Sequence, residues 1–344
     1  MTWPLLNIIN IWKLEQQRNR KQSSKMTTLK TTHWAAELIV RYLRLSTYLA
    51  VTLVSYVFTF PLEEAREHFS FDTSTLSWMM IILFRNLFLE VVLIGGWHWY
   101  LYERKSKVVA SLKFNKTNQY ESSKHNLKRE QFYTTLGFLM STVYEIIILR
   151  LWATKSPYIR PYYSDFWAHP MWSVFQLLLI GYWRDFHFYF VHRVMHPWRF
   201  QVFGKVDIGQ WLYKHVHSLH HKSYNPGPWS GLSMHPFEHL LYYTCTSLNF
   251  IFVLHPIHFL FNKFHADLSP IAGHDGHDQP AGGSLFHYLH HAHFECNYGT
   301  PMVPLDVWFG TYVATEKEWC NLCDRSRSTR IMRRRKIVDV GSDS

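Results

Sequence analysis

Long apolar segments constrain the fold of this chain more than any other feature of its sequence. An α-helix needs about 20 apolar residues to cross the hydrocarbon core of a bilayer. Four stretches meet this requirement, namely residues 38–60, 76–102, 132–152 and 171–191. We therefore predict an all-α fold, an integral membrane helical bundle of about four transmembrane helices.

A fifth apolar stretch, residues 240–261, is interrupted by His255 and Pro256. Proline removes a backbone hydrogen bond and stops a regular helix. The stretch is therefore predicted to enter the membrane as a bent hairpin, and a complete fifth span is the alternative.

Basic residues predict the orientation in the membrane, because Lys and Arg near the ends of spans accumulate on the cytoplasmic side. They cluster before the first span, in the loop 103–131 and in the tail after residue 324, whereas residues 61–75 are acidic. Both termini are thus predicted to be cytosolic. The net charge of +11 is explained mainly by this topology, and its division among three places disfavours nucleic-acid binding.

Histidines are crowded in residues 214–221, KHVHSLHH. Two charged imidazoles about 4 Å apart would repel each other by roughly 4 kcal/mol at an effective dielectric constant near 20. On an α-helix, His217, His220 and His221 lie within one arc of about 100° and are expected to converge on a single point, while His215 points to the far side and should be exposed.

The same H-x-x-H-H spacing recurs at His287, His290 and His291. A third group, His192 and His196, stands four residues apart at the end of the fourth span. A helix over residues 171–196 would be about 39 Å long, more than the roughly 30 Å of hydrocarbon, so this pair should lie just beyond the membrane on the cytoplasmic side.

A bound divalent ion would keep these imidazoles neutral and remove their repulsion. Neutral imidazoles bind Zn, Cu, Fe and Ni. Eight ring nitrogens exceed the four that a tetrahedral zinc ion takes. The spacing therefore predicts two metal ions in one site.

The three histidine motifs, HRVMH, HSLHH and HYLHH, and the following HFECNYGTPMVPLDVWFGTY resemble the fatty acid hydroxylase superfamily over about residues 171–312. These membrane di-iron enzymes include sterol C5-desaturases and sterol 4-methyl oxidases. The resemblance implies a cytosolic histidine-rich helical cap that holds two Fe ions, with Zn as a substitute, and O2 as the oxidant. It also implies electrons from cytochrome b5 or a similar carrier with an NAD(P)H reductase, and a location in the endoplasmic reticulum membrane.

The resemblance implies that the metal ligands are His192, His196, His217, His220, His221, His287, His290 and His291. Further histidines of the family lie between the last two motifs, and the candidates here are His265, His235 and His239. Asp185, Tyr189 and Glu238 are candidates for support of the ligand rings, and no separate catalytic residue is expected. His274 is a further candidate ligand, but for His274 and His277, which stand in a Gly- and Asp-rich loop, a solvated position is favoured. His293 should point away from the site.

These observations divide the chain into four parts: a polar cytosolic segment 1–37, transmembrane helices over 38–170, a catalytic domain over 171–312 and a basic tail 313–344. The function that the resemblance implies is hydroxylation or desaturation of a C–H bond of a membrane lipid, and a sterol is favoured over a fatty acyl chain. The alternatives are an ether-lipid monooxygenase or an aldehyde-to-hydrocarbon enzyme of the same superfamily, a histidine-rich metal transporter, and a catalytically inactive membrane scaffold.

Overall fold

A computed structural model describes residues 45–57, 73–104, 106–198, 207–278 and 283–324. Regular structure in these ranges is helical, and the β-pairing within them is one isolated bridge between Lys113 and His277. The all-α prediction is therefore confirmed for the described part of the chain.

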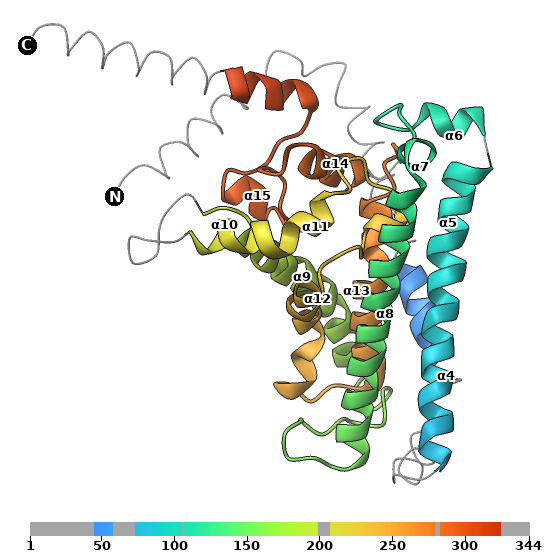
Figure 1. The fold of residues 1–344 in the computed structure, drawn as a ribbon. Helices are drawn as coiled ribbons and strands as arrows, with labels where there is room; N and C mark the ends of the chain where they lie inside the picture. The colour runs from blue at the N-terminus through green and yellow to red at the C-terminus, as the bar shows by residue number, and fades with distance from the viewer. Residues whose placement is uncertain (1–44, 58–72, 105, 199–206, 279–282, 325–344) are drawn as a thin grey trace, which may run out of the picture.

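Two long helical rods stand side by side (Figure 1). The first begins with α4 (Thr73–Leu89) and continues through the π-helical turn η1 (Glu90–Gly95), α5 (Gly96–His98) and the π-helical turn η2 (Trp99–Glu103). The second is α8 (Lys124–Ala153). Both rods are long and apolar enough to cross a membrane, over Leu76–Glu103 and Lys124–Ala153.

Two of the predicted spans thus form helices of sufficient length and hydropathy. The first predicted span is described only over Leu45–Val57, a shorter apolar helix. The fourth forms α9 (Pro170–Val194), which is not among the helices with the length and mean hydropathy to cross a membrane.

The predicted break at His255 and Pro256 is confirmed. Residues 240–261 do not form one helix, but are divided among α12 (Pro236–Tyr243), the 3-10 helix η5 (Thr244–Phe250) and α13 (Pro256–Gly273). The His255 Nδ1 atom accepts a hydrogen bond from the Ile257 backbone N–H at 3.1 Å and so caps α13, which begins at a proline that needs no such bond.

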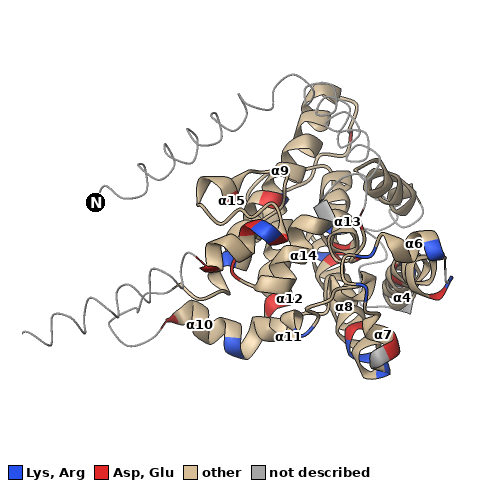
Figure 2. Cartoon of the chain, turned by 90° about the horizontal axis from the view of Figure 1, so that it is seen from above, with Lys and Arg blue, Asp and Glu red and all other residues tan. Residues whose placement is uncertain are grey.

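Short helices gather at one end of the long rods (Figure 1). They are α6 (Lys107–Ser111), α7 (Gln119–Ser122), α10 (Ile208–Leu212), the π-helical turn η3 (Tyr213–His217), α11 (Ser218–His221), the 3-10 helix η4 (Pro228–Ser230), α14 (Gly283–His293), α15 (Leu305–Trp308) and a helix over residues 316–324. We call this end the cap. In the view from above, blue segments that mark Lys and Arg appear on α6, near the cap end of α8 and close to α11 (Figure 2).

Helix α13 is the centre of the packing. Its residues 256–268 are buried, and α8, α9 and α14 pack against it. Burial of its apolar side chains, such as Phe259, Leu260 and Phe264, supplies hydrophobic stabilisation of about 25 cal/mol for each Å² removed from water.

The core also contains paired charges. The Arg85 guanidinium on α4 contacts the Glu145 carboxylate on α8 at 2.5 Å, and the Lys263 ammonium on α13 lies 3.4 Å from Glu145 and 2.7 Å from Asp267. Two cations and two anions therefore balance in a buried network that joins α4, α8 and α13.

We predict that Glu145→Gln destabilises the protein by about 3–5 kcal/mol, because it leaves two buried cations with one carboxylate. Thermal unfolding of the purified protein in detergent measures this change. Glu103→Gln is the matched control, because Glu103 is exposed. Equal unfolding temperatures for the two variants would contradict the prediction.

Candidate metal centre

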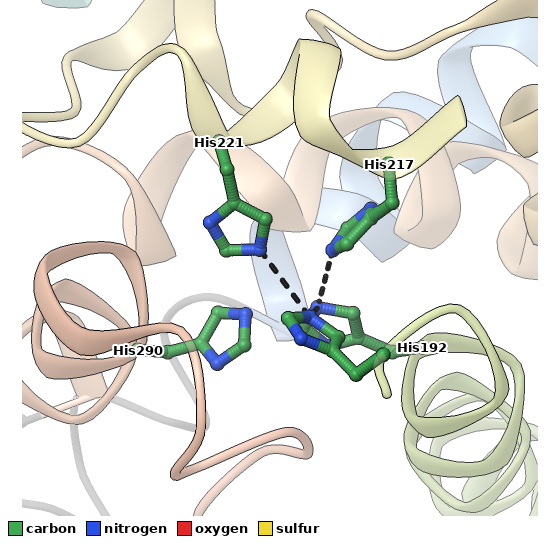
Figure 3. Close-up of side chains that lie close together, drawn as sticks. His192, His217, His221 and His290 are labelled. Carbon is green, nitrogen blue, oxygen red and sulfur yellow. Dashed lines mark hydrogen bonds between the residues drawn. The ribbon is translucent and has the colours of Figure 1, made fainter. Parts of the chain in front are cut away.

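Nine buried histidines form two clusters in the cap. The five-histidine group consists of His192, His196, His217, His221 and His290, and the four-histidine group consists of His220, His274, His287 and His291. In each group, one ring nitrogen from every histidine lies within 4.8 Å of the others. Figure 3 shows four rings of the first group pointing toward one another from three separate parts of the chain.

Each H-x-x-H-H motif is divided between the two groups. His217 and His221 belong to the five-histidine group and His220 to the four-histidine group, whereas His287 and His291 belong to the four-histidine group and His290 to the other. Residues i and i+4 on a helix are about 40° apart, and residue i+3 projects to the other side of residue i. The expectation that each motif converges on one point is therefore wrong, because each motif lies between the two groups.

The local helix geometry also differs from the regular α-helix expected for the first of these motifs. His217 ends the π-helical turn η3, and α11 then carries His220 and His221. Single π-helical turns occur often at functional sites. His215 is exposed, as expected.

Hydrogen bonds at Nδ1 determine which ring nitrogen faces the centre of the five-histidine group. His192 Nδ1 lies 2.6 Å from the Tyr298 carbonyl, and His290 Nδ1 lies 2.6 Å from the Cys296 carbonyl. A carbonyl oxygen only accepts, so each of these Nδ1 atoms carries the proton and each Nε2 atom keeps a lone pair.

The same arrangement holds in the four-histidine group. His274 Nδ1 lies 2.8 Å from the Pro270 carbonyl, and His220 Nδ1 lies 3.3 Å from the Ser233 carbonyl. Their Nε2 atoms face each other at 3.2 Å. In the five-histidine group, the Nε2 atoms of His192 and His217 are 3.0 Å apart.

Lone pairs that face each other at such distances repel unless a cation lies between them. A proton is a poor candidate, because burial lowers the pKa of His290 to about 3 and that of His274 to about 4. His291 has no hydrogen-bond partner on either ring nitrogen in the described part of the chain. The donor set therefore fits a metal ion in each group.

The expectation that His274 and His277 are solvated is wrong. His274 is 4% exposed and belongs to the four-histidine group. His274 directly follows Gly273, the last residue of α13, so the position of this long buried helix places His274 in the cap. His277 is also buried, and its Nδ1 atom lies 2.7 Å from the Asp275 carbonyl. A local Gly- and Asp-rich composition does not reveal this burial, because the residues that cover the loop, such as Tyr102 and Phe114, come from elsewhere in the chain.

Three predicted ligands lie outside both groups. His235 caps α12 through a hydrogen bond from the Phe237 backbone N–H to its Nδ1 atom at 3.1 Å. His239 packs against Gly137 of α8, where a Cβ atom would lie 2.3 Å from its ring. His265 stacks on Tyr48 with ring centroids 5.0 Å apart.

The three predicted supporting residues have different surroundings. Glu238 is buried, and its Oε1 atom lies 2.7 Å from His217 Nδ1, so it is placed to hold that ring. Asp185 accepts a hydrogen bond from Arg184 at 3.0 Å, and Tyr189 stacks on Phe309. His293 points away from the groups and contacts Glu316 at 2.9 Å.

Comparisons with known proteins agree with this geometry. Residues 177–311, which contain all nine histidines, match the family model described as fatty acid hydroxylase. Two Delta(7)-sterol 5(6)-desaturases of Gibberella zeae are 30% and 27% identical, over 44% and 49% of this chain and 40% and 50% of their own. A very-long-chain aldehyde decarbonylase of Oryza sativa is 31% identical over 41% of this chain and 54% of its own.

The chain thus spans about half the length of the curated relatives it matches. No solved structure matches it. The family match and the desaturase relatives agree with the histidine spacing, and they identify residues 177–311 as a domain similar to the fatty acid hydroxylase family.

Proposed function

We propose that this protein is a membrane-bound non-haem di-iron oxidase that uses O2 and external electrons to hydroxylate or desaturate a C–H bond of a lipid. The observation that carries this proposal is the pair of buried, all-imidazole groups with opposed Nε2 lone pairs inside the region that matches the family. One iron ion would occupy each group, and zinc could substitute for it.

Bound iron would supply the redox chemistry with O2 that protein side chains lack. The side chains of this chain do the rest. Burial of the nine histidines excludes bulk water, and carbonyl groups and Glu238 hold the rings with Nε2 facing inward. No separate catalytic acid or base is proposed.

Helix α9 supports access from the bilayer, because its polarity is inverted relative to a helix in a water-soluble protein. It buries Gln176, Arg184 and Asp185, and it exposes large apolar side chains along its length, among them Phe175, Leu178, Leu179, Phe186 and Phe190. An extended exposed apolar surface of this kind marks a membrane or protein contact. We therefore propose that α9 contacts lipid and spans the membrane over residues 171–191.

The connection between α12 and α13 has the same character. Ile251 and Phe252 at the break are 63% and 54% exposed. Exposed apolar side chains at the tip of a bent helical segment support its insertion into the membrane as a hairpin. A lipid would then reach the histidine groups sideways from the bilayer.

A sterol is the favoured substrate class, because the two desaturase relatives act on sterols by name. An aldehyde-to-hydrocarbon reaction is the second candidate, because another relative is named an aldehyde decarbonylase. A metal transporter would place its ligands at mid-span, whereas both groups here lie in the cap, where His192 stands in the last turn of α9.

The cap is proposed to face the cytosol, where a cytochrome b5-type carrier with an NAD(P)H reductase would supply the electrons. Basic segments at the cap end support this orientation (Figure 2). We propose the endoplasmic reticulum membrane as the location, with both termini cytosolic. The segment 1–37 and residues 325–344 of the tail lie outside the described residues.

Metal analysis and lipid analysis together test the proposed function. We expect protein purified in detergent to contain about two iron ions per chain, and cells that lack the protein to accumulate a lipid one oxidation step less advanced. Elemental analysis by mass spectrometry and lipid profiling measure these outcomes. Protein without iron or zinc, or an unchanged sterol and fatty-acid profile, would refute the proposal.

Substitution of His274 tests the composition of the four-histidine group. We expect His274→Ala to lower the iron content toward one ion per chain and to abolish turnover, because three imidazoles remain in the group. His277→Ala is the matched control, since His277 is also buried but lies outside both groups. An iron content that is equal in the two variants would show that His274 is not a ligand.

A further inference from the structure

The segment that follows the last histidine motif is held in a tight turn. Asn297 adopts a positive φ of 54°, a conformation that Asn tolerates better than most residues. Its side-chain amide donates to the Phe286 and Val313 carbonyls at 3.0 and 2.9 Å, and its Oδ1 atom accepts from the Val313 backbone N–H at 2.7 Å. These bonds tie the turn to α14, which carries three of the nine histidines.

The buried carboxylate of Asp306 contacts the backbone of this turn. Asp306, on α15, accepts hydrogen bonds from the backbone N–H groups of Tyr298 and Gly299 at 2.8 and 2.7 Å and from the Thr311 hydroxyl at 2.6 Å. Burial raises the pKa of Asp306, and these three hydrogen bonds oppose the rise. Both oxygens accept from donors, which is the pattern of an ionised carboxylate.

Gly299 permits this close approach. A Cβ atom at this position would lie 3.0 Å from Asp306 Oδ2 and 3.1 Å from the Tyr189 ring. Both distances are shorter than ordinary van der Waals contacts, so a side chain here would displace the carboxylate or the ring.

The peptide group between Tyr298 and Gly299 connects Asp306 to the five-histidine group. Its N–H donates to Asp306, and its carbonyl accepts the proton of His192 Nδ1 at 2.6 Å. Hydrogen bonds in such a chain polarise one another. The negative charge of Asp306 therefore strengthens the carbonyl as an acceptor for His192.

We propose that Asp306 is a positioning residue for the five-histidine group, which acts through the Tyr298–Gly299 peptide to hold His192 as the Nδ1–H tautomer with Nε2 directed at the metal. This inference rests on the proposed function, since it requires that the histidines bind metal. It goes beyond that function, because it gives the NYG segment, residues 297–299, and Asp306 a role in the five-histidine group alone.

The two histidine groups then differ in the charge of the groups that hold the Nδ1 atoms of their histidines. In the five-histidine group, Glu238 contacts His217 directly, and Asp306 reaches His192 through a peptide. In the four-histidine group, the Nδ1 atoms of His220 and His274 meet neutral carbonyls. Two carboxylates should thus make the five-histidine group the tighter site for a divalent cation.

Titration of the metal-free, full-length protein in detergent with Zn(II) alone tests this inference. Wild type should bind two ions with unequal affinity. Asp306→Asn, which keeps the size of the side chain but removes its charge and one acceptor, should weaken the tighter site by about 10–100-fold and leave the other unchanged. Gly299→Ala should act in the same direction, because it displaces the carboxylate without removing it.

Asp267→Asn is the matched control. Asp267 is a buried carboxylate that, like Asp306, accepts from three donors, here the side chains of Lys263, Tyr243 and Ser141, but it lies in the ion-pair network. We expect it to lower the unfolding temperature and to leave both zinc affinities unchanged.

The outcomes separate this inference from the proposed function. If wild type binds no zinc, the proposed function fails. If wild type binds two ions and Asp306→Asn binds both with unchanged affinity, only the role of Asp306 is refuted. Equal weakening of both sites by Asp306→Asn would also refute it, because that result indicates a general structural role.

Discussion

The structure of the cap depends on a conflict between lone pairs. Backbone carbonyls and Glu238 fix the proton on Nδ1 of several histidines, and packing then brings their Nε2 atoms to within 3.0–3.2 Å of one another. Such an arrangement is unstable without cations. In the proposed function, the helices around it support metal ions, whose binding free energy would contribute to the stability of the cap.

Much of this arrangement could be predicted from the sequence, because helical spacing determines angles along one element. The pair His192 and His196 and the two H-x-x-H-H motifs supply eight of the nine clustered histidines. Spacing does not determine what faces an element from elsewhere in the chain. The division of each motif between two groups, the arrival of His274 from the end of α13 and the positions of His235, His239 and His265 outside the groups all depend on tertiary packing.

The long helices show that mean hydropathy, too, predicts only part of the structure. Residues 76–102 and 132–152 form helices apolar enough to be recognised as spans. Helix α9 carries polar residues that lower its mean hydropathy, yet it buries them against the rest of the protein and presents apolar side chains outward. Average hydropathy cannot separate these faces, whereas the distribution of exposure around the helix can.

The division of the H-x-x-H-H motifs has an evolutionary consequence. Insertion or deletion of one residue within a motif would rotate the following histidines by about 100° and so disturb both groups at once. A change in motif length therefore cannot alter one group without altering the other. Mutational tolerance to length changes should therefore be lowest within the motifs, and variation in length during divergence should be confined to the segments that connect them.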